Sequence, residues 1–316
     1  MSDADPFRRD HAPTPGRVER FGEDLRVVTA PNASPMTFTG TRSFILGRGG
    51  VAVVDPGPAL EGHLMSLEAA LEPGEWIEAI LVTHAHVDHT PAARVLAHRH
   101  GAPVLAFGDA RAGMSPVMER IDARALGGGE GVDTRFRPDR RLIDGERVAG
   151  RGGWALRAIH TPGHMGNHLC FHWEERGLVF SGDHVMGWAT TLVSPPDGDL
   201  TAFMDSLDRI EARAAGSVLH PGHGAPVDDP VPLIRYIREH RRLRENQIVD
   251  ALGQGAATPL ELTAALYRDV PATLHPAASR NVLAHLVDLT ERGLVQPDDA
   301  PGLGTRFSLV RRRSAP

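Results

Sequence analysis

Lysine is absent from this chain, cysteine occurs once, and aromatic residues make up only 5% of it. All 34 basic residues among the 316 are arginines, which excludes a Schiff-base lysine or the lysine of a P-loop. Because Cys170 is the single cysteine, a disulfide framework within the chain is excluded. No apolar run approaches the ~20 residues that cross a bilayer, so we expect no membrane partner. The remaining composition, 41% hydrophobic and 23% charged, is that of an ordinary globular protein.

The charge is negative overall and unevenly distributed. A net charge of −6 argues against a protein that coats nucleic acid by bulk charge. Residues 231–316 nevertheless carry 12 arginines against 9 acidic residues. The first sixteen residues contain no hydrophobic signal-peptide core, which together with the single cysteine predicts a reducing, cytoplasmic location. Proline and charge in this stretch predict a flexible N-terminus over residues 1–16.

Residues 17–230 alternate between strand-like and helix-like patterns, which is typical of a layered domain. A glycine-rich turn at residues 47–50 between two short apolar runs predicts a hairpin. Thr90 is expected to cap a helix that starts at Pro91 and ends before Gly101. Further strands and helices are predicted at residues 60–71, 77–82, 154–159, 169–173, 178–180, 200–210 and 218–219.

Residues 231–316 have the pattern of a winged helix, with three helices followed by a hairpin. A charged helix comes first. A capping box formed by Thr258 and Glu261 opens the second helix, and Gly293 stops the third. Residues 109–150 show no clear period and are predicted to form a loop or an insertion.

The 17 histidines are the strongest compositional lead, because several fall at metal-ligand spacing. His84, His86 and Asp88 alternate along an extended segment, so their side chains project to one side, with His89 alongside. Imidazole and carboxylate ligands suit Zn²⁺, and also Mn²⁺ or iron. Four such residues do not fill two coordination shells, so more distant ligands are required. The candidates lie beside glycines where predicted strands end: His164, Asp183 and His223.

The pattern His-x-His-x-Asp-His, followed by Gly-His, Gly-Asp and Gly-His, resembles the metallo-β-lactamase superfamily over roughly residues 20–230. The C-terminal pattern and the segments SGDHVMGWATT, HPGHG and REHRRLRENQI resemble the lactamase-β-two-like group, which includes endoribonucleases acting on single-stranded RNA. The resemblance implies an α/β (α+β) fold. An αββα metallo-β-lactamase sandwich would span residues 17–230, and a winged helix would span residues 231–316.

Carried over residue by residue, the resemblance implies a centre for two divalent metal ions, with zinc expected. One ion would take three histidines: His84, His86 and His164. The other ion would take Asp88, His89 and His223. Asp183 would bridge the two ions, and Asp55 would steady the ligands from behind. The catalytic carboxylates would be Asp88 and Asp183.

Such a centre predicts hydrolysis without a protein nucleophile. Two ions about 3.5–4 Å apart can share one water and lower its pKa, and the metal-bound hydroxide is then the nucleophile. Asp88 would both bind a metal and orient that hydroxide. The resemblance makes an RNA phosphodiester the leading substrate, with a thioester or another small ester, as in glyoxalase II, as the alternative. A third interpretation is a nucleic-acid or protein binding module with a vestigial metal site, and a homodimer is also open.

Several other residues have two interpretations each. Arg241, Arg242 and Arg244 are expected to form a solvated helix face, or else to line an RNA strand. Trp188 either stacks on a flat substrate or packs in the core. Many antibiotic-hydrolysing members of the superfamily place a cysteine where this chain has Asp183, so we expect little β-lactamase activity. Four histidines beside the candidate ligands are expected to support the site or the fold: His160, His168, His184 and His220.

Overall fold

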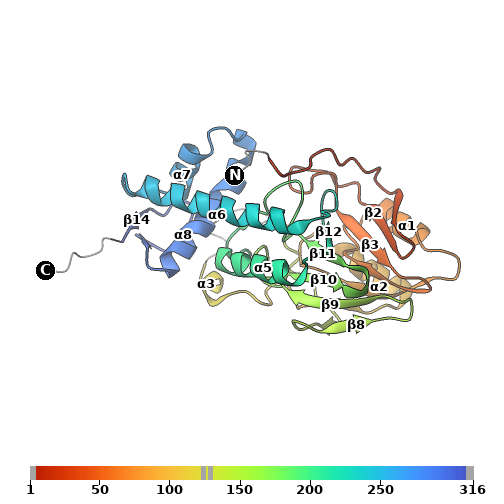
Figure 1. Ribbon diagram of the computed structural model, residues 1–316. Helices are drawn as coiled ribbons and strands as arrows, with labels where there is room; N and C mark the ends of the chain where they lie inside the picture. The colour runs from red at the N-terminus through yellow and green to blue at the C-terminus, as the bar shows by residue number, and fades with distance from the viewer. Residues whose placement is uncertain (1–4, 122–125, 127–130, 311–316) are drawn as a thin grey trace.

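Two β-sheets lie face to face in the computed structural model, which describes residues 5–121, 126 and 131–310 (Figure 1). The first sheet has its strands in sequence order: β1 (Val18–Phe21), β2 (Leu25–Thr29), β3 (Arg42–Leu46), β4 (Gly50–Val54), β5 (Trp76–Leu81), β6 (Val104–Ala106) and β7 (Arg140–Arg141). The second sheet has the order β12-β11-β10-β9-β8, built from β8 (Arg147–Ala149), β9 (Ala155–His160), β10 (Leu169–Trp173), β11 (Leu178–Gly182) and β12 (Val218–Pro221).

The predicted hairpin at residues 47–50 is confirmed as the antiparallel pair β3–β4, in which Leu46 lies opposite Ala52. Gly47 and Gly49 adopt φ angles of 85° and 74° there, which is the left-handed region that glycine enters without steric cost. β4, β5 and β6 then run parallel; β4 and β6 are buried throughout, and β5 is buried from Ala79 to Leu81, which explains the apolar sequence of these segments.

Large apolar side chains from both sheets fill the space between them, among them Phe44, Phe171, Trp173 and Phe180. Helices α1 (Glu61–Ala69) and α2 (Pro91–His100) cover the outer face of the first sheet. Helices α5 (Leu200–Arg213) and α6 (Pro230–Leu252) cover the outer face of the second. The order of layers is therefore αββα, and the predicted fold class is confirmed.

The start of α2 differs from the prediction. Thr90 makes no side-chain capping hydrogen bond, and its φ and ψ of −100° and −34° are already helical. Its hydroxyl instead donates to the carbonyl of His86 at 3.1 Å and to Asp133 Oδ2 at 2.9 Å. Thr90 occupies the N-cap position and Pro91 follows it as predicted, but the hydroxyl is engaged by the preceding turn and a distant loop and does not bond to a helix amide. Gly101 ends the helix with a φ of 66°, as predicted.

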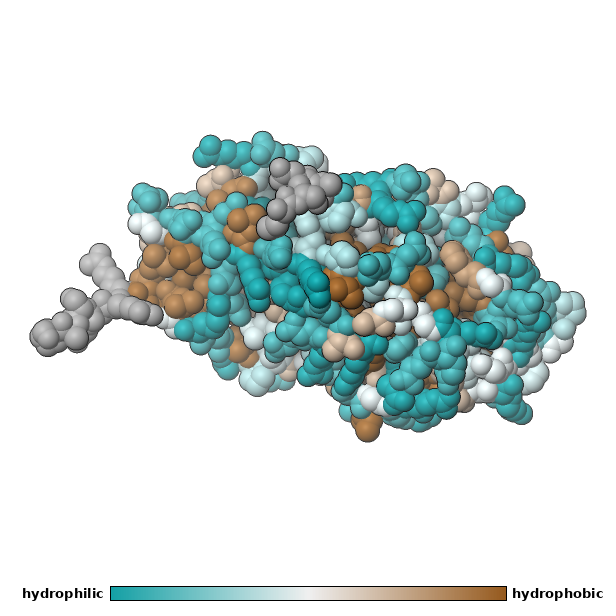
Figure 2. Space-filling view, in the orientation of Figure 1, coloured by the Kyte–Doolittle hydropathy of each residue, from teal (hydrophilic) through white to brown (hydrophobic). Residues whose placement is uncertain are grey.

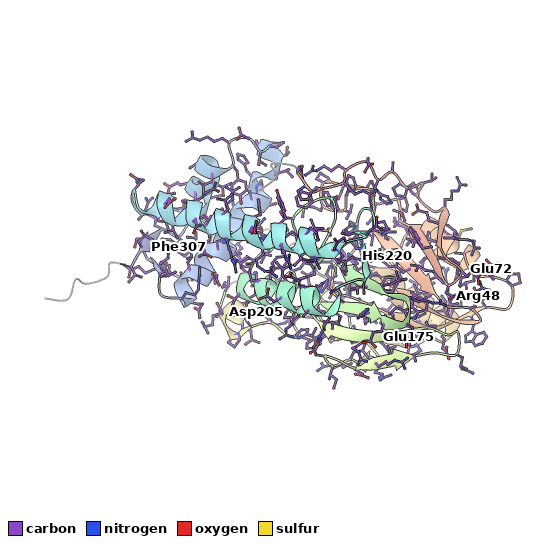
Figure 3. The ribbon with its side chains drawn as sticks, viewed as in Figure 1. Arg48, Glu72, Glu175, Asp205, His220 and Phe307 are labelled. Atoms are coloured by element: carbon purple, nitrogen blue, oxygen red, sulfur yellow. The ribbon has the colours of Figure 1, made fainter. Side chains whose placement is uncertain are left out.

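The C-terminal region contains the helices and hairpin of the predicted winged helix: α7 (Pro259–Leu266), α8 (His275–Glu291), β13 (Val295–Pro297) and β14 (Phe307–Leu309). Thr258 and Glu261 form the predicted capping box, and Gly293 has a φ of 69° just after the third helix. Phe307 lies in the hydrophobic core of this C-terminal region and is fully buried (Figure 3).

Helix α6 belongs to both regions. Ile234 and Ile237 in its first half pack with α5 against the second sheet, whereas Ile248 and Leu252 in its second half pack with α7 and α8. The predicted boundary between residues 230 and 231 therefore coincides with the start of one helix that continues across both units.

Residues 109–150 are not wholly irregular where they are described, because they contain α3 (Pro116–Glu119), β7 and β8. Met118 of α3 packs into the C-terminal cluster. The N-terminal segment, predicted to be flexible, also makes defined contacts from residue 5 onward. Phe7 packs edge-on against Tyr236 at 5.6 Å between ring centroids.

The surface in view is largely hydrophilic, with a hydrophobic patch at the end of the molecule that carries the β13–β14 hairpin (Figure 2). Two short 3-10 helices, η1 (Glu174–Arg176) and η2 (Ala272–Leu274), complete the described elements. None of the helices in the described residues combines the length and the hydrophobicity that crossing a bilayer requires.

Candidate metal centre

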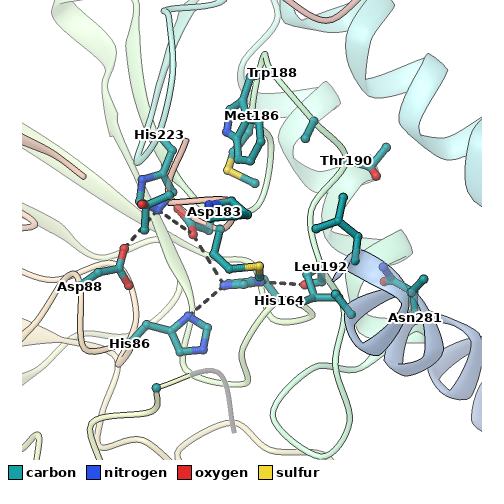
Figure 4. Close-up of a pocket in the computed structure, with 18 of the residues that line it drawn as sticks. His86, Asp88, His164, Asp183, Met186, Trp188, Thr190, Leu192, His223 and Asn281 are labelled. Atoms are coloured by element: carbon teal, nitrogen blue, oxygen red, sulfur yellow. Dashed lines mark hydrogen bonds and ion pairs between the residues drawn. The ribbon is translucent and has the colours of Figure 1, made fainter. Parts of the chain in front are cut away.

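All of the predicted ligands lie in loops that follow strands of the two sheets. Figure 4 labels five of them: His86, Asp88, His164, Asp183 and His223. The segment from His84 to His89 follows β5 and turns tightly into α2, with the amide of His89 donating to the carbonyl of His86 at 3.0 Å. The remaining three come from loops after β9, β11 and β12: His164, Asp183 and His223.

Three histidines form the first cluster. Nδ1 of His86 lies 3.0 Å from Nε2 of His84 and 3.1 Å from Nε2 of His164. The opposite nitrogen is occupied in two of the three rings, because His84 Nδ1 donates to Thr83 Oγ1 at 3.0 Å and His164 Nδ1 donates to the carbonyl of Leu192 at 2.8 Å. His86 Nε2 has no hydrogen-bond partner within the described residues. Burial lowers the pKa of His84 well below its usual value and that of His86 to about 3. Neutral rings in this arrangement turn lone pairs toward one point, which is what a metal ion requires.

Asp88, His89 and His223 form the second cluster. Asp88 Oδ2 lies 3.2 Å from the Nε2 atoms of both histidines. His223 Nδ1 donates to the carbonyl of Gly40 at 3.2 Å, which leaves Nε2 facing the carboxylates. Although burial opposes its charging, the carboxylates of Asp183 and Asp88 raise the pKa of His223 to about 10. The acidic groups also raise the pKa of buried His89 well above its usual value. The carboxylates of this cluster therefore stabilise a positive charge beside them, which protons on the histidines or a metal ion can supply.

Asp183 lies between the two clusters. Its Oδ1 is 3.6 Å from His89 Nε2, and its Oδ2 is 3.2 Å from His223 Nε2 and 3.8 Å from His164 Nε2. The carboxylate thus reaches histidines of both clusters, as a bridging ligand would. A Cβ on Gly222 would lie 2.5 Å from Asp183 Oδ1, so only glycine fits beside this carboxylate.

The donor set fits a divalent metal ion. The ligand atoms of each of three overlapping triads lie within 4.8 Å of one another: His84, His86 and His164; His84, His89 and Asp183; Asp88, His89 and His223. Within the described part of the chain, the buried atoms His89 Nε2 and Asp183 Oδ1 make no well-aligned hydrogen bond, although they lie 3.6 Å apart and Asp88 Oδ2 is 3.2 Å from His89 Nε2. Buried polar atoms of this kind are costly unless something charged completes them.

Asp55 supports the ligands as the resemblance implied. Its Oδ2 accepts from His89 Nδ1 at 3.0 Å and from Thr83 Oγ1 at 2.7 Å, and its Oδ1 accepts from the amide of Thr83 at 2.8 Å. Thr83 Oγ1 in turn accepts from His84, so one carboxylate orients a ligand of each cluster. Asp55 also has a φ of 48°, which is rare for a residue other than glycine.

Three further residues support the site, and of these only His168 was expected to do so. Thr41 donates its hydroxyl to Asp88 Oδ2 at 2.9 Å, and Asn32 Oδ1 accepts from the amide of Thr41 at 2.8 Å. His168 Nε2 accepts from the amide of Asp183 at 3.2 Å. His168 stood among the neighbouring histidines, but nothing in the spacing pointed to Asn32 or Thr41, which precede the histidine motif by a whole hairpin.

The other neighbouring histidines serve packing. His160 stacks on Phe107 with ring centroids 3.8 Å apart. His184 packs against Phe203 at 4.5 Å, and His220 lies among aromatic rings near the end of β12 (Figure 3).

A pocket of about 440 Å³ opens over the clusters. Its floor includes five predicted ligands: His86, Asp88, His164, Asp183 and His223. Its walls are mainly apolar, and the C-terminal region supplies one of them: Tyr267, Val270, Leu274, Ala277, Ala278 and Asn281. Trp188 is half-buried, stacks on Phe38 at 4.9 Å between ring centroids and lines the pocket, so it does not pack in the core. No arginine or lysine occurs among the described lining residues.

The arginines of α6 do not form the predicted solvated face. Arg241 is buried and donates to the carbonyl of Thr191 and to Asn281 Oδ1, the latter at 3.0 Å. Arg244 lies over the ring of Tyr267 at 3.9 Å. Of the three arginines considered for RNA, Arg242 is the exposed one. The prediction failed because partners from the hydrolase loops and from α7 reach across to the helix.

Comparison with known proteins shows the relationship directly. Residues 36–240 match the metallo-beta-lactamase superfamily. The chain belongs to this superfamily. Residues 258–303 match the beta-lactamase associated winged helix domain. A beta-lactamase-like protein 2 homolog from Drosophila melanogaster is 30% identical over 87% of this chain and 91% of its own length. The predicted resemblance to the lactamase-β-two-like group is therefore confirmed.

A second relative is named as a hydrolase, and a solved structure shares the fold. An atrochrysone carboxyl ACP thioesterase of Aspergillus fumigatus is 30% identical over 78% of this chain and 74% of its own length. A beta-lactamase domain protein from Burkholderia ambifaria has the same fold, with a TM-score of 0.79 over 95% of this chain and 96% of its own, at 22% identity. This chain is a metallo-β-lactamase superfamily hydrolase whose histidine and aspartate cluster is able to hold a metal ion.

Proposed function

We propose that the protein hydrolyses a thioester, or a comparable small ester, that carries an apolar acyl group, with two zinc ions held by the seven clustered side chains. The single observation that carries this proposal is the composition of the pocket. Its walls are apolar and its described lining contains no basic side chain apart from the histidines of the floor. An apolar chain gains free energy by leaving water for such walls.

The same observation weighs against an RNA phosphodiester. A nucleic-acid strand carries a charge on every phosphate, and proteins bind it mainly with lysine and arginine. The RNA hypothesis placed the strand along the arginines of α6, but Arg241 and Arg244 are engaged inside the protein. The Aspergillus fumigatus relative, a thioesterase by name, supports the ester alternative.

The residues divide the work as follows. His84, His86 and His164 would hold one ion, Asp88, His89 and His223 the other, and Asp183 would lie between them. Two divalent ions, when bound, lower the pKa of a water and stabilise charge on a carbonyl oxygen. Asp88 is the most exposed of the carboxylates, at 21% of its side chain, and so is placed to accept a hydrogen bond from the attacking water. The apolar walls keep other water away and hold the acyl carbonyl over the floor.

Turnover of matched substrates tests the proposal. Purified protein loaded with zinc, and separately with manganese, is given a medium-chain acyl thioester, single-stranded RNA and a cephalosporin. We expect thioester hydrolysis that disappears in His86→Ala, intact RNA, and little cephalosporin turnover. Cleavage of RNA with the thioester left intact would overturn the proposal.

A further inference from the structure

Helix α8, which a DNA-binding winged helix would place in a groove, faces the hydrolase loops instead. Asn281 Oδ1 accepts from the amide of Val193 at 3.0 Å. Arg280 donates to Ser194 Oγ at 3.1 Å, and Asp288 accepts from Thr201 at 2.6 Å. This face of the helix therefore contacts the hydrolase domain of the same chain and forms part of the pocket wall.

The side-chain amide of Asn281 has a fixed orientation. Two donors, the amide of Val193 and Nη1 of Arg241, both lie 3.0 Å from its Oδ1. An oxygen must face two donors, so the assignment of oxygen and nitrogen follows from the hydrogen bonds. Nδ2 is left without a partner in the described part of the chain, although Asn281 lines the pocket. Figure 4 shows Asn281 on α8, across the pocket from Asp88.

The same network reaches a metal ligand. Arg241 also donates to the carbonyl of Thr191, and the carbonyl of the next residue, Leu192, accepts from His164. Val193, held by Asn281, follows immediately. The short segment 191–193 thus connects α6 and α8 with the first cluster, and Asn281 lines the same pocket as His164.

We propose that the winged-helix domain recognises the acyl part of the substrate. Asn281 Nδ2 donates a hydrogen bond to an acceptor oxygen on the acyl chain beyond the scissile carbonyl. Val270, Leu274 and Ala278 pack against the apolar remainder. Asn281 is then a specificity-determining residue, and the preferred substrate class is an acyl thioester that carries a ketone or hydroxyl group along its chain. This inference rests on the proposed function.

The test uses the full-length, zinc-loaded protein and two thioesters of equal chain length, one with a ketone in the acyl chain and one without. Asn281→Asp keeps an oxygen for Val193 and Arg241 but removes the Nδ2 donor. Asn281→Ala removes both. Asn246→Asp, at an exposed position on α6 outside the pocket, is the matched control for the added charge.

We expect the wild type to prefer the ketone-bearing thioester about tenfold in kcat/KM, the value of one hydrogen bond. Asn281→Asp should lose that preference while keeping its metal content, Asn281→Ala should lose it and also slow both substrates, and Asn246→Asp should match the wild type. No preference in the wild type, or an unchanged preference in Asn281→Asp, overturns this inference alone. Failure of the wild type to hydrolyse either thioester overturns the proposed function and this inference with it.

Discussion

Replacing Asp55 by asparagine should weaken the metal centre without touching a metal ligand. Asparagine tolerates the left-handed φ of 48° at this position, so the backbone change is small. The amide can turn its oxygen toward His89 and the Thr83 hydroxyl, but its NH2 then faces the Thr83 amide that now donates at 2.8 Å. The variant therefore loses one buried hydrogen bond and the charge that strengthens the other two.

The expected loss follows from these contacts. One buried donor left unsatisfied costs about 1–3 kcal/mol, and the neutral acceptor weakens the remaining bonds further. Supporting groups behind histidine ligands typically change metal affinity 10–100-fold, and we expect a loss in that range. The cluster with His89 should weaken more than the cluster with His84, because His89 contacts Asp55 directly and His84 only through Thr83.

Competition with a chromophoric zinc chelator measures both affinities in one titration. Asp133→Asn is the matched control, since Asp133 Oδ2 also accepts from a threonine hydroxyl, that of Thr90 at 2.9 Å, but contacts no predicted ligand. Affinities of Asp55→Asn within twofold of the wild type would refute the reasoning. An equal loss in Asp133→Asn would show that any nearby carboxylate matters, and would refute it as well.

Three other changes have expected outcomes. Asp183→Ala should remove both ions, because its carboxylate reaches both clusters, and elemental analysis that still finds two ions would contradict the bridge. Ala278→Leu should lower kcat/KM for long acyl thioesters more than for short ones, because it fills the pocket wall; an unchanged ratio would contradict this. Burial lowers the pKa of His240 to about 4 and that of His285 well below its usual value. Below pH 6.5 the unfolded chain therefore binds more protons than the folded chain. The free energy of unfolding should decrease by about 1.4 kcal/mol for each histidine and for each unit by which the pH is lowered. In urea unfolding of the metal-free protein, the free energy of unfolding should depend less steeply on pH in His285→Gln than in the wild type. An identical pH dependence would contradict the lowered pKa of His285.

That the candidate ligands cluster could be predicted because much of their signal is local. His84, His86, Asp88 and His89 lie within one turn, where spacing alone decides which side chains project together. The more distant ligands were accessible only because each stands beside glycine at the end of a strand and in the order of a known family. The structure brings all of these side chains to one edge, as the αββα layers require.

The groups that orient the ligands carry no comparable signal. The carbonyls of Gly40 and Leu192 hold His223 and His164, and every residue has a carbonyl. Arg241 shows the same limit from the other direction. A run of arginines on a helix is usually solvated, and only the tertiary contacts with Thr191 and Asn281 place this one inside the protein.

The winged helix and the hydrolase sandwich are best regarded as one catalytic unit. Leu233, Ile234 and Ile237 of α6 belong to the core outside the second sheet, and burying three such side chains contributes about 5–9 kcal/mol. The same helix carries Arg241, whose hydrogen bond to Thr191 anchors the segment that orients His164. Helix α6 therefore both stabilises one layer and positions the loop of a candidate metal ligand, which links the two regions structurally. In the function proposed above, the mainly apolar pocket wall that this arrangement creates would select the acyl group of the substrate.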